Sequence, residues 1–264
     1  MLAKNEAKFI NSLKLKKNRD QEGLFVAEGV KIVNDLLHSG MKVKTIYSSR
    51  NFQLSIFNYH IDVIRIKESE LKRISSLNSP NEVLAVCEIP HYNLDHAILG
   101  KQLSLVLDTI QDPGNLGTII RIADWFGIES IICSPETVEV YNPKVIQATM
   151  GSISRVKVHY TELPAFMEAQ QKQTKRGEDF AVYGAALDGE NLYETDLKAK
   201  GFVVIGNESR GISSDLLPFI THKICIPSFS LPLTGLQAGI SSAESLNAAI
   251  ATAVICSEFR RRLK

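Results

Sequence analysis

The sequence predicts an α/β protein of two domains, on the strength of three observations. Short apolar runs alternate with amphipathic segments along the 264 residues. Hydrophobic residues make up 44% and charged residues 22% of the chain, proportions typical of a globular protein with a substantial core. The alternation is interrupted at residues 90–101, PHYNLDHAILGK, which contain Pro, His and Gly and show little periodicity. We therefore expect domains at residues 1–97 and 98–264.

Residues 1–97 are expected to form a small parallel or mixed sheet covered by helices. The first helix is predicted from apolar positions 9, 10 and 13, which follow helical spacing. The expected strands are LFVAEG, VKTIYS, IDVIRI and VLAVCEI, and the charged helix KESELKRISSL precedes the last of them. A further helix, VKIVNDLLHSG, ends at Gly40 and is expected to turn these residues inward: Val30, Val33, Leu36 and Leu37.

A second α/β series follows residue 101. Its expected strands are LSLVLD, SIICS, FAVYGAAL, FVVIG and KICIP, and two of its helices are NLGTIIRIADWFG and NPKVIQATMG. Pro143 near the first turn and Gly151 just past the end mark the limits of the second helix. A long terminal helix, ESLNAAIATAVICSEFRRR, is expected to bury these residues: Leu246, Ala249, Ile250, Ala253 and Val254.

Composition excludes several classes of protein. No apolar run approaches the roughly 18 residues that cross a bilayer, and the N-terminus alternates charged with apolar residues, unlike a secretory signal. The four cysteines lack CxxC or CxxH spacing, so neither a metal site nor a redox pair is expected. Free thiols in a reducing compartment are the simplest interpretation, which predicts a cytoplasmic protein without metal.

Basic residues are concentrated at the N-terminus. Six of the first nineteen residues are Lys or Arg and one is acidic. This charge suits a polyanion such as RNA, and a solvated helix face explains it equally well. The candidate RNA contacts are Lys14, Lys16, Lys17 and Arg19.

The first candidate functional loop is Asp112–Gly117. The chain lacks the nucleotide signatures GxGxxG and GxxxxGK[ST], but this loop follows a predicted strand, where open α/β sheets bind ligands. Asn115 can cap the helix that follows, and Arg121 lies less than two turns further on. An ordinary capped connection also explains the loop. An arginine among isoleucines is less expected in that interpretation, because an unpaired buried charge is unfavourable.

Two further loops leave strand ends. In Gly206–Gly211, the two glycines allow close backbone approach, and Glu208 and Arg210 place opposite charges beside the strand. The third loop runs from Ile226 to the triplet Ser-Leu-Asn at 245–247, which opens the terminal helix. A surface turn with a weak ion pair, and ordinary helix caps, are the alternative explanations.

Taken in order, DPGNLGTIIRIADWFG, GNESRG and IP…SLNAAIATA resemble the SpoU/TrmH family of RNA ribose 2′-O-methyltransferases, within the SPOUT class. LFVAEGVKIVNDLL resembles the small L30e-like α/β/α substrate-binding domain that often precedes this catalytic domain. The resemblance implies a parallel-sheet SPOUT catalytic domain with a C-terminal trefoil knot. It also implies a homodimer through the C-terminal domain, S-adenosyl-L-methionine as cofactor, and RNA as substrate. We expect ribosomal RNA rather than transfer RNA, because a basic helix beside an L30e-like domain suits a structured ribosomal target.

The resemblance also implies residue roles. Catalytic residues would be Asn115, Arg121 and Glu208, and Arg210 joins the RNA contacts. Arg121 is interpreted as a phosphate clamp and electrostatic stabiliser, while the family view allows it as base. The cofactor contacts would be Gly206, Ile226, Ser245, Leu246 and Asn247, with Ala185, Ala186 and Leu187 beside them. Loop 228–243 is longer than the family's usual loop. A non-catalytic RNA-binding module and a Rossmann-type enzyme remain alternatives.

Overall fold

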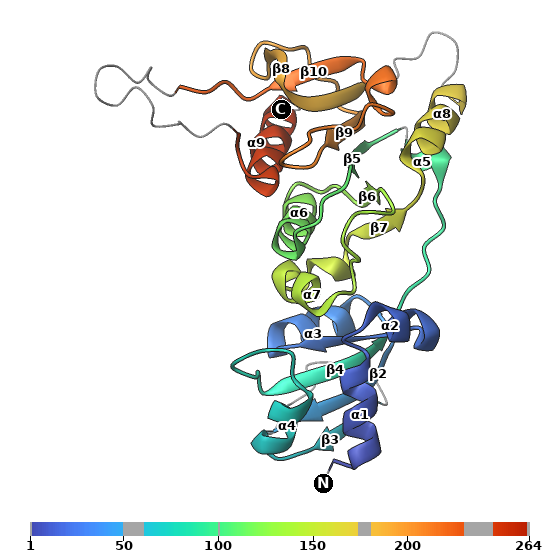
Figure 1. The fold of residues 1–264 in the computed structure, drawn as a ribbon, viewed down its shortest axis with the longest axis vertical. Coiled ribbons are helices and arrows are strands. Elements are labelled where there is room, and N and C mark those ends of the chain that lie inside the picture. Colours follow the sequence, from blue (N-terminus) through green and yellow to red (C-terminus); the bar gives the residue numbers. More distant parts are fainter. Residues whose placement is uncertain (1, 50–60, 100, 174–180, 230–244, 263–264) are drawn as a thin grey trace. The chain divides into compact units, whose positions relative to one another are not determined.

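Each of the two alternating series forms its own sheet in the computed structural model (Figure 1). The structure describes residues 2–49, 61–99, 101–173, 181–229 and 245–262. By packing, the first unit contains residues 1–93 together with 116–121 and 138–157. The second contains residues 94–115, 122–137 and 158–264. The division into functional domains at residue 97 stays a prediction.

The first unit is built on a four-stranded mixed sheet in the order β1-β4-β2-β3. Strand β1 (Leu24–Glu28) pairs antiparallel with β4 (Val83–Glu88), and β4 pairs antiparallel with β2 (Val43–Ser48). The pairing of β2 with β3 (Asp62–Arg65) is parallel. Every residue of β1 is buried, so both of its faces are covered. The predicted small mixed sheet is confirmed.

Helices surround this sheet. They are α1 (Lys4–Ser12), α2 (Lys16–Glu22), α3 (Val30–His38), α4 (Glu68–Ile74), α7 (Pro143–Thr149) and the 3₁₀ turn η1 (Ser152–Ser154). Ile10 and Leu13 are almost fully buried in the core, as the helical spacing predicts. The inward orientation predicted for Val30 is wrong: it is 42% exposed, because it occupies the first position of α3, while Val33, Leu36 and Leu37 are buried.

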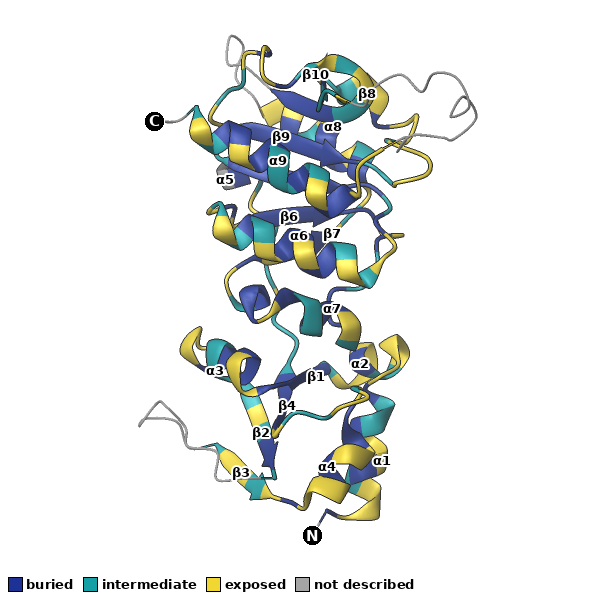
Figure 2. Ribbon diagram, turned by 90° about the vertical axis from the view of Figure 1, so that its left-hand side faces the viewer, coloured by how far each residue is buried: buried dark blue, intermediate teal, exposed yellow. Residues whose placement is uncertain are grey.

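The second unit is built on a six-stranded sheet in the order β10-β8-β9-β5-β6-β7. The pairings of β10 with β8, β8 with β9, β9 with β5 and β5 with β6 are parallel. The strands are β5 (Leu103–Leu107), β6 (Ser130–Cys133), β7 (Lys157–Tyr160), β8 (Val182–Asn191), β9 (Gly201–Ile205) and β10 (His222–Cys225). Strands β5, β6 and β9 are buried throughout, as expected for a parallel sheet covered on both faces (Figure 2).

Helices cover both faces of the second sheet. On one face, α5 (His96–Leu99) and α8 (Leu163–Gln173) share a core with the central strands. On the other lies α9 (Ala248–Arg261), with the C-terminal end of α6 (Pro113–Trp125) on the same side (Figures 1 and 2). The 3₁₀ turn η2 (Leu217–Phe219) precedes β10. Strand β7 and helix α8 were not predicted from the sequence.

The burial predicted for the terminal helix is confirmed at Ala249 and wrong at Leu246 and Ile250. Asn247 caps α9, so the helix begins at Ala248 rather than at Ser245. Leu246 therefore precedes the helix and is 46% exposed, and Ile250 is 54% exposed. Besides Ala249, the buried stripe contains Ala248, Thr252, Ile255, Cys256, Glu258 and Phe259. Apolar residues on the other side of α9 are left facing solvent.

Two further expectations concern the course of the chain. The trefoil knot depends on the path of residues 230–244, which lie outside the described residues, as does most of loop 228–243. The knot stays a prediction. No helix in the described part of the chain is both long and apolar enough to cross a membrane.

Candidate functional site

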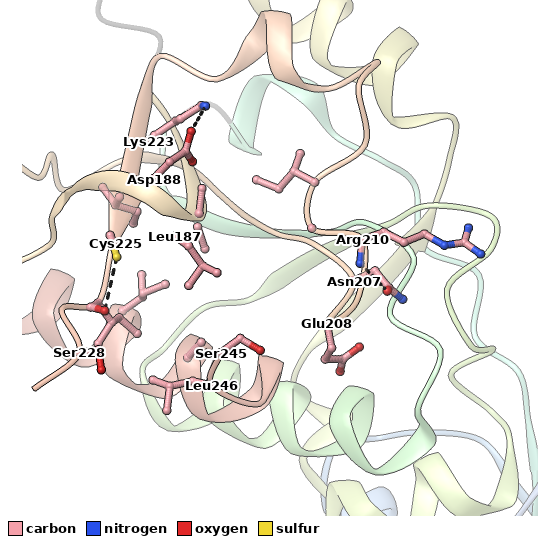
Figure 3. Close-up of a pocket in the computed structure, with 18 of the residues that line it drawn as sticks. Leu187, Asp188, Asn207, Glu208, Arg210, Lys223, Cys225, Ser228, Ser245 and Leu246 are labelled. Carbon is pink, nitrogen blue, oxygen red and sulfur yellow. Dashed lines mark hydrogen bonds and ion pairs between the residues drawn. The ribbon is translucent and has the colours of Figure 1, made fainter. Parts of the chain in front are cut away.

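A pocket of about 750 Å³ opens at the carboxyl ends of β8, β9 and β10 (Figure 3). Because the strands are parallel, the segments that leave them meet at one edge of the sheet. The pocket is lined by residues 185–188 of β8, the turn after β9, and residues 223–229 of β10 and its continuation. Ser245, Leu246, two residues of α9 and three apolar residues of the segment between β9 and β10 complete the lining. All of these segments belong to the second unit.

The turn after β9 is tight because backbone groups at its two ends are hydrogen-bonded to each other. Asn207 and Gly211 exchange two backbone hydrogen bonds of 3.0 and 2.8 Å. A Cβ atom on Gly206 would collide with the backbone of Gly211, so only glycine fits there. The side-chain Oδ1 of Asn207 accepts hydrogen bonds from the amides of Ser209 and Arg210, at 3.0 and 3.2 Å. The turn therefore leaves the side chain of Glu208 exposed at the pocket wall.

A chain of side-chain hydrogen bonds links the three predicted loops. The Nδ2 of Asn115 donates to Oε1 of Glu208, and the Nδ2 of Asn247 donates to Oδ1 of Asn115 at 2.8 Å. Asn247 Oδ1 also accepts from the first amides of α9, at 3.0 and 3.3 Å. The order Asn247–Asn115–Glu208 therefore fixes which way each amide faces. Within the described part of the chain, the second oxygen of the Glu208 carboxylate accepts no hydrogen bond, so it can accept one from a ligand.

An ion pair lies on the opposite wall of the pocket. Lys223 Nζ on β10 is 2.7 Å from Asp188 Oδ2 on β8, as Figure 3 shows. The hydrogen bond from Lys223, followed by its positive charge, lowers the pKa of Asp188 below its usual range. Both side chains are largely solvent-exposed, so the pair marks the mouth of the pocket rather than its floor.

The cysteines are free thiols. Three of them are buried, and burial raises the pKa of each, to about 12 for Cys256. Cys225 is half-buried, lines the pocket and donates from Sγ to the carbonyl of Ile226 at 3.4 Å. Among the described residues, no group of three or more His, Cys, Asp or Glu side chains is arranged to hold a metal ion.

The structure brings together most of the residues predicted to bind cofactor. Those that line the pocket are Ala185, Ala186, Leu187, Ile226, Ser245 and Leu246. Gly206 and Asn247 are not lining residues: Gly206 packs against the backbone of Gly211, and Asn247 bonds Asn115. Of the predicted catalytic residues, Glu208 lines the pocket, whereas Asn115 and Arg121 are not among its lining residues. Arg121 is exposed on α6. The neighbouring Ile119 and Ile120 occupy the buried face of α6, so the guanidinium is not an unpaired buried charge.

The predicted RNA contacts divide into two groups. Lys14, Lys16 and Lys17 are exposed, and Arg210 is exposed beside the pocket. Arg19 is not available to RNA, and its assignment is corrected here. It is 2% exposed and forms a salt bridge with Glu139. A guanidinium held inside the protein by a carboxylate is a structural group.

Several lining residues were missed by reasoning from sequence. The ion pair of Asp188 and Lys223 and the thiol of Cys225 all flank predicted strand ends, so the rule that parallel sheets bind ligands there could have found them. Ile212, Leu217 and Ile220 come from the segment between β9 and β10. No sequence pattern marks that segment as part of a site.

Comparisons with known proteins match the whole architecture. A family model described as the SpoU rRNA Methylase family matches residues 102–257, and a model described as an MRM3-like substrate binding domain matches residues 4–85. The structure of an AdoMet-bound rRNA methyltransferase from Sinorhizobium meliloti is 30% identical, covers 100% of this chain and 97% of that chain, and gives a TM-score of 0.83.

Two other relatives agree with this match. The SpoU methyltransferase AviRb from Streptomyces viridochromogenes, solved in complex with the cofactor AdoMet, is 25% identical, with 99% and 98% of the two chains covered and a TM-score of 0.81. The 23S rRNA (guanosine(2553)-2′-O)-methyltransferase RlmP of Bacillus subtilis is 28% identical over 261 residues, which is 98% of this chain and 97% of that protein.

Proposed function

Because this chain belongs to the SpoU rRNA methylase family, we propose that it is an enzyme that methylates a ribose 2′-hydroxyl of ribosomal RNA with S-adenosylmethionine. The observation that carries the proposal is the pocket at the carboxyl edge of the second sheet, which the second and third predicted loops line and which the first loop reaches through the hydrogen bond from Asn115 to Glu208. Two of the related proteins, from Bacillus subtilis and Sinorhizobium meliloti, are named as rRNA methyltransferases, which favours this substrate over transfer RNA.

The pocket fits S-adenosylmethionine in size and chemistry. About 750 Å³ lies within the roughly 300–1,000 Å³ of typical small-molecule sites. Apolar side chains, among them Leu187, Ile212 and Leu246, offer a surface for the adenine ring, and polar groups at the rim suit the charged methionine end. We propose that Gly206, Ile226, Ser245 and Asn247 complete the binding site through their backbone groups or through the neighbours they hold. When bound, the cofactor supplies an electrophilic methyl group.

Arg121 is proposed to bind the phosphate beside the target ribose and to stabilise the negative charge that develops on the 2′ oxygen. A guanidinium presents several N–H donors in a fixed plane and stays charged in proteins, so it suits both tasks and is a poor general base. Asn115 is proposed to orient Glu208, since its amide donates to that carboxylate. The carboxylate can then accept a hydrogen bond from the substrate or cofactor with its other oxygen.

RNA binding is proposed to involve Lys14, Lys16 and Lys17 in the first unit and Arg210 in the second. All four side chains are exposed, and the match of residues 4–85 to a substrate-binding domain supports a role for the first unit in holding RNA. Lysine and arginine contacts with phosphates supply affinity without dependence on base sequence.

We further propose a homodimer formed through the second unit. Trp125 on α6 is 84% exposed and Ile250 on α9 is 54% exposed. Arg260 of α9 joins the end of α6, because its guanidinium donates to the carbonyls of Phe126 and Gly127 at 2.6 and 2.9 Å. Exposed large apolar side chains on joined helices favour a partner that covers them. The free thiols agree with the cytoplasm as the proposed location.

The test is direct. Purified protein titrated with S-adenosylmethionine in a calorimeter is expected to bind it, and 2′-O-methyl mapping of ribosomal RNA from cells lacking the protein is expected to reveal one lost methyl group. If ribosomal methylation were intact and a methyl group were lost from transfer RNA instead, the substrate would be transfer RNA. If the protein did not bind the cofactor, the alternative of a non-catalytic RNA-binding module on the same fold would be favoured.

A further inference from the structure

We propose that Asp108 and Thr109, at the end of β5, are positioning residues that hold the turn 206–211 and so set the place of Glu208. The inference rests on the proposed methyl transfer for its functional consequence. Neither residue lines the pocket, neither was singled out in the sequence, and both belong to the same unit as the turn.

Thr109 has a strained backbone. Its φ is 60°, in the left-handed region, where a β-branched side chain is a rare outlier. Neighbouring groups hold it there: its amide donates to Oγ of Ser134 at 3.0 Å, and its hydroxyl donates to Oδ1 of Asp108 at 3.1 Å. Ser134 is itself buried. Strain of this kind persists only where the surroundings over-determine it, and it is concentrated at functional sites.

The strained conformation directs the Thr109 carbonyl at the turn. Asn207 Nδ2 donates to this carbonyl at 2.9 Å. Asn207 Oδ1 faces the other way and accepts from the amides of Ser209 and Arg210. One side chain therefore joins the end of β5 to the interior of the turn, and its amide has no freedom to flip without losing bonds on both sides.

Asp108 holds the far side of the same turn. Its Oδ2 accepts from the amide of Ser213 at 2.7 Å, and its own amide donates to the carbonyl of Ile205 at 2.9 Å. Two consecutive residues thus fix the chain just before and just after the turn. Asp108 is 4% exposed, whereas Glu208 is exposed. Apart from the hydrogen bond from Asn115, the position of this exposed carboxylate depends on the buried groups that hold its backbone.

This arrangement predicts that glycine is tolerated better than valine at position 109. Valine has the shape of threonine, but it keeps the β-branch that disfavours the left-handed region and loses the hydroxyl bond to Asp108. Glycine shares no side chain with threonine, yet it adopts this conformation readily and keeps the carbonyl that Asn207 needs. We expect Thr109→Val to release the turn and Thr109→Gly to rescue its geometry.

The experiment compares the full-length wild type with Thr109→Val, Thr109→Gly and the control Thr161→Val, a threonine outside the left-handed region. Hydrogen exchange of the amides in 206–213 is measured first, because it needs no activity. We expect at least tenfold faster exchange there in Thr109→Val, and rates within about threefold of wild type in Thr109→Gly and in the control. Equal exchange in Thr109→Val and wild type, or equal acceleration in Thr109→Gly, would overturn the proposal.

Activity then tests whether the residue acts through Glu208. At saturating cofactor and RNA, Thr109→Val is expected to lower kcat at least tenfold, with Thr109→Gly recovering most of the loss. In a Glu208→Gln background the same change should lower kcat no further. Additive losses would show that Thr109 does not act through Glu208. Asn207→Asp, which keeps the acceptor within the turn and removes the donor to Thr109, should reproduce the faster exchange. Wild-type protein without methyl transfer would contradict the proposed function, and the exchange result would still decide this inference.

Discussion

Arg19, which is buried, and Glu139, which is 16% exposed, form an ion pair although they lie 120 positions apart in the chain. Nε and Nη2 of Arg19 lie 3.1 and 2.5 Å from Oε2 of Glu139, and Nη1 donates to the carbonyls of Leu13 and Lys14 at 2.9 Å. The other oxygen of Glu139 accepts from the amide of Tyr141 at 2.7 Å. Both residues belong to the first unit, so the pair ties segment 138–157 to the N-terminal sheet and helices.

Removal of one partner of this pair is expected to destabilise the protein strongly. Arg19→Ala leaves the Glu139 carboxylate without its countercharge, and such losses amount to about 3–5 kcal/mol. Urea denaturation of the variant measures the difference. The double variant Arg19→Met with Glu139→Leu should recover much of the stability, because no unpaired charge remains. A double variant as unstable as Arg19→Ala would contradict the account.

Arg121→Ala is expected to lower the rate of methyl transfer by about 10²–10³-fold, the loss typical when one stabilising donor is removed from a transition state. Cofactor affinity should stay within a few-fold of wild type, since Arg121 is not among the residues that line the pocket. Single-turnover kinetics and calorimetry provide the two measurements. Arg155→Ala, an exposed arginine of the first unit, is the matched control. If Arg121→Ala lost cofactor binding and activity to the same extent, the role proposed for Arg121 would be contradicted.

Replacement of Lys14, Lys16 and Lys17 by alanine should weaken RNA binding and reduce its dependence on salt. Each lost phosphate contact lowers the slope of log K against log salt by about 0.7–0.9, so the slope should fall by about two. Fluorescence anisotropy at several salt concentrations measures it. Deletion of residues 1–19 is a poorer test, because it also removes buried Ile10, Leu13 and Arg19. An unchanged slope would identify the lysines as a solvated face.

Glu258 is expected to make stability depend on pH in the acid range. Hydrogen bonds from Arg261 and Arg262 lower the pKa of this carboxylate to about 2, against the 4.5 of an unperturbed glutamate. A folded-state pKa below the unfolded value gives a contribution that is complete above pH 4.5 and lost as pH falls toward 2. Chemical denaturation across this window, compared with Glu258→Gln, tests it. The variant should lose part of this dependence, and identical curves would exclude Glu258 as its source.

Trp125 is the sole tryptophan of the chain, so its fluorescence reports on the surface of α6. If the proposed dimer covers this side chain, emission should be blue-shifted at micromolar protein and shift to the red on dilution or in Ile250→Glu. Light scattering gives the mass in the same samples. A monomer at micromolar concentration that retains methyltransferase activity would refute the dimer.

Features of the fold and of the candidate site could be predicted from the sequence where they depend on residues close together in the chain. Glycine and proline act within a few residues, so the loop after β9 could be located before the fold was known. The predicted cap on α6 is wrong: Asp112, not Asn115, caps the helix, and its Oδ1 accepts from the amide of Asn115 at 2.8 Å. The burial of Arg19 could not be predicted, because its partner is remote in the chain. In the sequence, Arg19 also resembles the solvated basic residues beside it. Likewise, the conformation of Thr109 arises from tertiary hydrogen bonds, and the sequence gives no sign that this threonine adopts a left-handed backbone conformation. The buried stripe of α9 was misplaced except at Ala249, because small and apolar residues occur all round the first turns of this helix and leave the buried face ambiguous.

The amide chain through Asn247, Asn115 and Glu208 also bears on how the protein folds. Its two hydrogen bonds join residues 93 and 132 positions apart in the chain. Contacts of such long sequence separation close large loops, and the entropy lost in doing so is recovered only after the intervening sheet has formed. We expect helices and strands to appear first during refolding, and competence to bind cofactor to lag behind them. Newly made chains would then pass through a stage that has native secondary structure and no methyl-transfer activity.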